Sequence, residues 1–177
     1  MHNKVNGLPI HPSELVKDFN INELNGVKIT FINMPLRESA LPNTPPEGPA
    51  ILSSIVRQYG GEPYIIDLNG YRIKDNHALR RGLSNGRHMT YAEAEQMIYT
   101  HLNDVGHQDV IAFSGKITTL KWQEKVAEIV KRLQPDCFLV TGNGLATEIK
   151  EGLFHWIPEL DGIARSEGDD IMPLICK

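Results

Sequence analysis

Small and hydrogen-bonding residues follow two predicted strands, and they are the residues of this sequence best suited to hold a ligand. Ser114-Gly115-Lys116 and Thr141-Gly142-Asn143-Gly144 each begin where a buried, apolar run ends. The paired glycines Gly142 and Gly144 either supply the positive φ that a strand-to-helix turn needs, or leave a trench between strand ends for a bulky, flat ligand. The sequence leaves both interpretations open.

The elements that position these residues alternate between strand and helix. β-branched and aromatic runs predict strands at 27–32, 64–68, 109–113, 137–140 and 161–164. Helical periodicity covers 51–59 and 122–133, Thr90 and Glu93 have capping-box spacing for a helix through about residue 103, and 166–169 can cap a last helix. We therefore expect an α/β fold, a Rossmann-like three-layer sandwich with a five-stranded, mainly parallel sheet in flavodoxin-like order and helices on both faces.

In such a sheet, ligands bind beyond the carboxyl ends of the strands, where the strand order reverses. The stretch after the first strand, Asn33-Met34-Pro35-Leu36, has no glycine-rich phosphate loop, which counts against a dinucleotide or nucleoside triphosphate. It also lacks the paired carboxylates of a receiver domain and the Ser/Thr/Gly-rich turn of a flavodoxin. No catalytic or metal-ligating residue is predicted.

Charge and length limit the classes of partner. The 177 residues fit one compact domain, and a net charge of −4 argues against a nucleic-acid surface. We expect an N-terminal arm at 1–26 and an α/β domain at 27–177 that carries a basic insertion at about 70–89. That insertion, where five Lys and Arg residues oppose Asp75, is either a solvated loop or a docking surface for a partner domain.

The cysteines and the apolar runs indicate a compartment. Cys137 and Cys176 are the only cysteines and form no CxxC pair, as expected of a reducing environment. No apolar run approaches the roughly 20 residues of a membrane span, and the N-terminus lacks the apolar core of a signal peptide. We expect a cytoplasmic protein. His101 and His107 lack ligand spacing, which favours surface or capping roles.

Five motifs in order carry a resemblance to a known family. They are "FINMP", "PPEGPAILSSIVRQYGGEPYIIDLN", "DVIAFSG", "KRLQPDCFLVTGNG" and "DGIARSEGDD". Over about residues 27–170 the sequence resembles the cobalamin-binding domain found at the N-terminus of many radical S-adenosylmethionine enzymes. The resemblance implies cobalamin bound with its dimethylbenzimidazole tail detached from cobalt and buried at the sheet edge.

The resemblance also implies a set of cofactor-binding residues. Gly142 and Gly144 would open the groove for the tail, Ser114 and Thr118 would line it, and Asn143 would border it. Lys116 would meet a corrin amide or the phosphate unless it is simply exposed, and Glu167 would meet a ribose or amide unless it serves only the helix dipole. The corrin ring would rest over Pro35, Leu36 and the 42–46 loop. The full set is Asn33, Pro35, Leu36, Thr44, Ser114, Gly115, Lys116, Thr118, Thr141, Gly142, Asn143, Gly144, Glu167 and Gly168.

Two departures from the family and its relatives shape the expected function. Residues 33–39 lack the histidine that ligates cobalt in other cobalamin domains. Asp75 and His77 have the spacing of that motif, but they lie in a polar insertion after the second strand, so we interpret the match as a coincidence. The CxxxCxxC cluster motif of radical enzymes is absent, so the iron-sulfur cluster and S-adenosylmethionine would belong to a barrel domain in the full-length protein or in trans.

The expected function is therefore cobalamin binding for a radical S-adenosylmethionine enzyme, with methyl transfer through methylcobalamin as its expected use. By itself this chain is not expected to be catalytic. The alternative is a cofactor-free Rossmann-like interaction module that acts through the basic insertion or the N-terminal arm. A flavin-binding domain is a third hypothesis.

Overall fold

A five-stranded parallel sheet forms the centre of the computed structural model, which describes residues 4–5, 8–9, 12–35, 45–69, 80–82, 89–165 and 168–177. The strands lie in the order β4 (Glu62–Asp67), β3 (Lys28–Asn33), β5 (Val110–Ser114), β6 (Phe138–Gly142) and β7 (Gly162–Ile163). Every neighbouring pair in this sheet is parallel. In chain order this is the flavodoxin-like arrangement, so the predicted fold class is confirmed.

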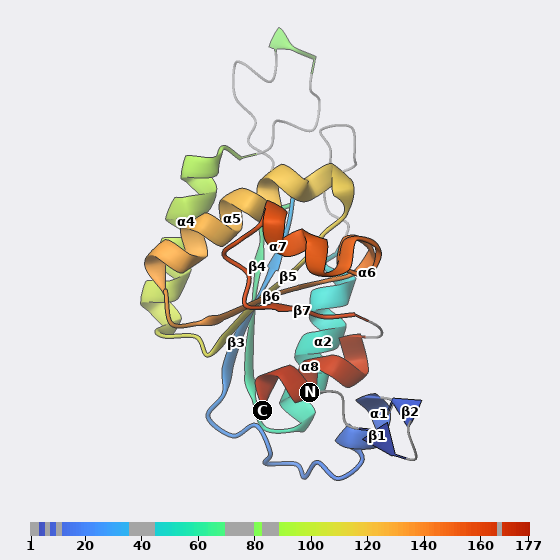
Figure 1. The fold of residues 1–177 in the computed structure, drawn as a ribbon. Coiled ribbons are helices and arrows are strands. Elements are labelled where there is room, and N and C mark those ends of the chain that lie inside the picture. The colour runs from blue at the N-terminus through green and yellow to red at the C-terminus, as the bar shows by residue number, and fades with distance from the viewer. Residues whose placement is uncertain are drawn as a thin grey trace.

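Helices cover both faces of the sheet (Figure 1). One core cluster joins the sheet to α4 (Tyr91–Val105), α5 (Leu120–Leu133), α6 (Gly144–Ile149) and α7 (Leu153–Trp156). The other joins it to α2 (Glu47–Gln58) and α8 (Gly168–Cys176). Short 3-10 turns, η1 (Ile117–Thr119) and η2 (Lys150–Gly152), connect elements, and β1 (Lys4–Val5) pairs antiparallel with β2 (Leu8–Pro9). Because both faces are buried, the central strands are apolar almost throughout.

The start of α4 is the capping box that the sequence predicts. Thr90 Oγ1 accepts a hydrogen bond from the Glu93 amide at 3.2 Å, and the Glu93 carboxylate accepts one from the Thr90 amide at 2.7 Å. These bonds satisfy backbone donors that the first helical turn leaves unpaired. The helix ends at Val105 because Gly106 adopts a φ of +81°.

The described part of the predicted arm packs on α8 and α2. Leu24 is fully buried in the core cluster on that side, and Phe19 meets Tyr59 edge to face at 5.5 Å between ring centroids. Lys177 forms an ion pair with Glu23 at 2.6 Å. Helix α1 (Pro12–Val16) lies against α8 as well. The division of the chain at residue 26 stays a prediction.

Aspartates fasten the amino ends of the strands. Asp109 Oδ2 accepts a hydrogen bond from the Lys28 amide at 2.8 Å, and Asp161 Oδ2 accepts one from the Leu139 amide at 2.7 Å. Lys131 Nζ lies 2.6 Å from Asp161 Oδ2 and donates to the Cys137 carbonyl at 2.7 Å. Lys131 and Asp161 thus provide hydrogen-bond partners for backbone groups at the edge where β6 and β7 begin.

His101 corrects one expectation of the sequence analysis. It is half-buried against the sheet, where its Nε2 lies 3.0 Å from the Thr30 hydroxyl, and that hydroxyl donates to Gln108 Oε1 at 2.9 Å. Its ring also meets Tyr64 edge to face. A surface or capping role was therefore wrong for His101, because the buried face of α4 extends to this residue, whereas His107 is exposed.

Burial raises the pKa of both cysteines. The thiol of Cys137 reaches a pKa of about 11 and that of Cys176 about 12, in each case mainly because burial penalises the thiolate. Both are free and buried. At neutral pH they are therefore thiols, which react slowly.

Replacement of Lys131 by Met is expected to lower the free energy of unfolding by about 1–3 kcal/mol, because the change leaves Asp161 and the carbonyls of Pro135 and Cys137, just before β6, without their charged partner. Lys121→Met is the control, since the ion pair of Lys121 with Glu124 is exposed and a change within about 0.5 kcal/mol is expected. Urea denaturation measures both. Equal losses in the two variants would contradict the proposed role of Lys131.

The pKa of His101 is lowered, chiefly by desolvation, so the unfolded chain binds more protons than the folded one as the pH falls. Stability is therefore expected to drop below the ordinary histidine pKa of 6.5. In His101→Gln this part of the loss should disappear, whereas His107→Gln should behave as the unchanged chain. Denaturation midpoints at pH 7.5 and pH 5 measure the difference, and an unaltered pH dependence in His101→Gln would refute it.

Candidate functional site

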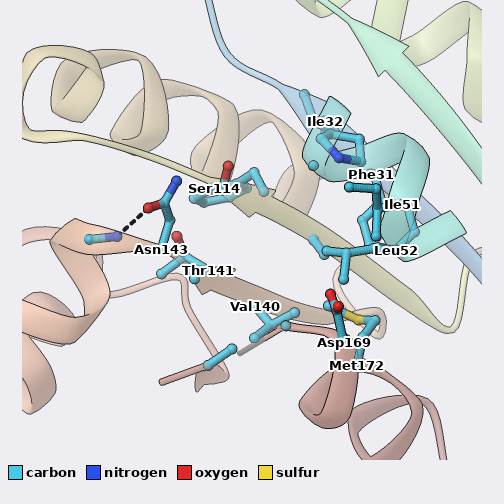
Figure 2. A pocket seen from close by; sticks show the side chains of 18 of the residues that line it. Phe31, Ile32, Ile51, Leu52, Ser114, Val140, Thr141, Asn143, Asp169 and Met172 are labelled. Atoms are coloured by element: carbon cyan, nitrogen blue, oxygen red, sulfur yellow. Dashed lines mark hydrogen bonds between the residues drawn. The ribbon is translucent and has the colours of Figure 1, made fainter. Parts of the chain in front are cut away.

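A groove of about 430 Å³ runs along one face of the sheet between α2 and α8 (Figure 2). Its floor comes from Phe31, Ala112 and Val140, on three neighbouring strands. Side chains alternate along a strand, so these residues share the face that α2 and α8 cover. Leu52 of α2 and Met172 of α8 form the walls. The groove thus lies against the core cluster that contains α2 and α8, toward the carboxyl ends of the strands.

Polar side chains gather at the mouth of the groove. Ser114, Asn143, Thr147 and Asp169 line it and are all exposed. Thr141 also lines it, but its hydroxyl is buried and has no hydrogen-bond partner among the described residues. By the alternation along β6, the Thr141 side chain shares the face of Leu139, opposite to Val140. The mouth is therefore polar and the floor apolar.

A second cavity of about 220 Å³ adjoins the groove. The two share four lining residues, Gly48, Pro49, Ser114 and Asn143. The second cavity also reaches Asn33 and Lys116, from the ends of β3 and β5. Ser114 and Asn143 therefore stand between the groove and the second cavity, both at the carboxyl edge of the sheet.

Asn143 carries the unusual backbone conformation of this turn. Its φ of 76° and ψ of −168° fall in a region that residues other than glycine rarely enter, at a cost on the order of 1–3 kcal/mol. Its side-chain oxygen accepts a hydrogen bond from the Gly144 amide at the start of α6 (Figure 2). Gly142 and Gly144 do not have positive φ, so the interpretation that these two glycines supply it is wrong.

The space around Gly142 and Gly144 agrees with the alternative, that small residues keep a trench open. A Cβ on Gly144 would meet nothing within 4 Å, and one on Gly142 would meet Ala164 Cβ at 3.5 Å, an ordinary contact. Neither glycine is therefore required by packing. Both line the groove, where longer side chains would take up its volume.

Gly115 is a glycine for a different reason, because a side chain there would collide with a buried core residue. A Cβ there would stand 2.0 Å from the Gln123 amide carbon. Gln123 is fully buried, and its Nε2 donates to the Lys116 carbonyl at 3.2 Å and to Thr119 Oγ1 at 3.3 Å. The glycine therefore allows a buried amide to hold the loop after β5.

The other predicted site residues fall in different places. Asn33 Nδ2 donates to Asp67 Oδ1 at 2.7 Å and lines the second cavity, as does exposed Lys116. Gly168 lines the groove. Exposed Thr118 and buried Pro35 lie outside the lining of both. Leu36, Thr44 and Glu167 lie outside the described residues, as does most of the basic insertion.

Sequence reasoning missed the apolar residues of the site. Phe31, Ala112, Val140 and Met172 are buried like any core residue, so no feature of their types separates them from the rest of the core. A signal was available in the strand alternation, because Ala112 and Val140 precede Ser114 and Gly142 by two positions and must share their face.

Comparisons with known proteins support the fold. No protein-family model and no curated protein matches the sequence. The cobalamin-dependent S-adenosylmethionine radical enzyme OxsB with aqua-cobalamin bound matches with a TM-score of 0.64 and 17% identity over 88% of this chain. The same enzyme with aqua-cobalamin and S-adenosylmethionine matches with a TM-score of 0.60 and 20% identity, again over 88% of this chain.

The extent of these matches limits what they show. This chain spans 19% of the length of OxsB, and at such identities the likeness shows the fold alone. A CheY-like protein (tadZ) from Pseudomonas aeruginosa PAO1 matches over 82% of this chain and 95% of its own, at 14% identity, but a TM-score of 0.47 supports no inference. Within the described ranges, no helix has the length and apolarity to cross a membrane. The chain is thus a Rossmann-like α/β domain with a groove at the carboxyl edge of its sheet.

Replacement of Gly115 by Ala is expected to lower the free energy of unfolding by about 1–3 kcal/mol, because the methyl group would overlap buried Gln123. Gly144→Ala is the matched control and should change stability by no more than about 0.5 kcal/mol, since its methyl group meets open space. Chemical denaturation compares them. Combining Gly115→Ala with Gln123→Ala should recover part of the loss, and strictly additive losses would refute the contact.

Proposed function

We propose that this chain is the cobalamin-binding domain of a radical S-adenosylmethionine enzyme and that the groove holds the lower-base tail of the cofactor. The observation that carries the proposal is the groove itself, an apolar slot with a polar mouth at the carboxyl edge of a flavodoxin-like sheet. The fold likeness to OxsB, described with aqua-cobalamin bound, supports this choice of ligand. The division into an arm at 1–26 and a domain at 27–177 belongs to the same proposal.

The size of the groove suits part of the cofactor. Its volume of about 430 Å³ lies in the range of roughly 300–1,000 Å³ usual for small-molecule sites. A bicyclic aromatic base with its ribose fits such a volume, whereas a corrin ring does not fit beside it. The tail must therefore leave cobalt to enter, so we propose base-off binding.

The polarity of the edge suits the remainder of the ligand. Ser114, Asn143 and Thr147 offer neutral donors and acceptors at the mouth, which match the amide groups around a corrin. Lys116, in the adjoining cavity, provides a positive charge for the nucleotide phosphate. Gly142 and Gly144 line the groove and, without side chains, leave its volume unfilled.

Bound cobalamin would supply a methyl carrier, and we propose methyl transfer as its use. The residues of this chain bind the tail, orient the ring and keep the lower axial position free of a nitrogen ligand, since residues 33–39 contain no histidine. A radical S-adenosylmethionine barrel, in the full-length protein or in trans, would generate the substrate radical. The basic insertion at about 70–89 is a candidate surface for its docking.

The test is an absorption titration of the purified chain with hydroxocobalamin, followed by desalting. Stoichiometric retention with a base-off spectrum is expected. Gly144→Leu should weaken binding at least about tenfold, because the side chain enters the groove. Glu148→Leu adds the same group to an exposed position of α6 outside the groove and should bind normally.

Loss of colour from the unchanged chain at saturating cobalamin would contradict the proposal and favour a cofactor-free interaction module. Equal affinity of Gly144→Leu and the unchanged chain would reject the groove as the binding site. Yellow protein as purified, with a flavin spectrum, would instead favour flavin binding.

A further inference from the structure

The floor of the groove offers no free hydrogen-bonding group to a ligand. Phe31, Ala112 and Val140 of the floor, and Met172 of the wall beside it, are each at most 4% exposed and carry only apolar side chains. The strand backbone beneath them is also occupied, because β5 lies between β3 and β6 and Ala112 stands opposite Phe31 and Val140 in the two ladders. A ligand atom at the floor therefore meets carbon atoms, with the sulfur of Met172 on the adjoining wall.

Hydrogen bonding is available at the mouth instead. Ser114, Asn143, Thr147 and Asp169 are the exposed polar residues of the lining. Thr141 is buried, but its side chain belongs to the opposite face of β6, with Leu139. A ligand that enters from the edge therefore passes a polar rim and then buries its far end in an apolar slot.

This division discriminates between lower bases. The far edge of dimethylbenzimidazole carries C–H and methyl groups, which lose little on leaving water. A purine brings ring nitrogens and, in adenine, an amino group, and burying these without partners is costly. A hydrogen-bonding group left unpaired in this way weakens binding about tenfold or more.

We propose that the groove selects cobamides by their lower base, and accepts an apolar arene such as dimethylbenzimidazole in preference to a purine. The inference rests on the proposed cobalamin function and specifies the class of cobamide that the chain takes. The floor residues, above all Val140 and Ala112, are the specificity determinants.

The test compares dissociation constants of the purified chain for cobalamin, adeninylcobamide and cobinamide, which lacks a lower base. Adeninylcobamide is expected to bind at least about tenfold more weakly than cobalamin, and cobinamide more weakly than cobalamin. Equal binding of cobalamin and adeninylcobamide would overturn the selectivity. If cobinamide binds as tightly as cobalamin, the tail does not occupy the groove. If none of the three binds, the cobalamin function itself is rejected.

A pair of variants locates the selectivity. Val140→Thr places a hydroxyl in the floor at nearly unchanged volume and should reduce the preference for cobalamin several-fold. Val110→Thr makes the same change on the same face of the sheet, at a buried position outside the groove, and should leave the preference unchanged. An unchanged preference in folded Val140→Thr, or an equal change in both variants, would overturn the assignment of Val140.

Discussion

A parallel sheet must bury both of its faces, and the rest of this structure depends on how that is achieved. On one face α4, α5, α6 and α7 pack closely on the strands and form the larger core cluster. On the other face, α2 and α8 cover the strands less completely and leave a groove over Phe31, Ala112 and Val140. The same apolar side chains that stabilise the fold therefore form the floor of the candidate site, so the groove needs no dedicated structural element.

The two ends of the strands have opposite chemistry. At the amino end, Asp109, Asp161 and Lys131 hold backbone groups with charged hydrogen bonds, which fix where the strands begin. At the carboxyl end, small residues such as Ser114 and Gly142 border the groove, and the charged residues Asp169 and Lys116 are exposed. Charged hydrogen bonds thus fix the starts of the strands, whereas the groove at their other end is left open. An apolar slot with neutral polar groups and the Asp169 carboxylate at its mouth favours a large, mostly uncharged ligand over a nucleotide that is bound by its phosphates.

Asn143 joins the fold to the proposed function. A backbone that glycine would adopt without strain is held here by an asparagine, which caps α6 and lines both cavities. Such strain is retained at functional sites because the side chain contributes what glycine cannot. Gly115 differs from Asn143, because there it is the absence of a side chain that matters and leaves room for Gln123 to pack.

The sequence by itself determined the five strands, their alternation with helices in a parallel sheet and the edge at which polar residues gather, because these follow from local periodicity, caps and strand ends that each occupy a few adjacent residues. Thr90 with Glu93 is the clearest case. The sequence did not predict α1, α6, α7 or the β1–β2 pair. It did not determine which of Gly115, Gly142 and Gly144 packs against a core side chain, nor that Asn143 has the positive φ, because these depend on residues distant in the chain. Only the tertiary structure decided that Phe31, Ala112, Val140 and Met172 line a groove, since a buried apolar residue looks the same in sequence whether its neighbour is another side chain or an open slot.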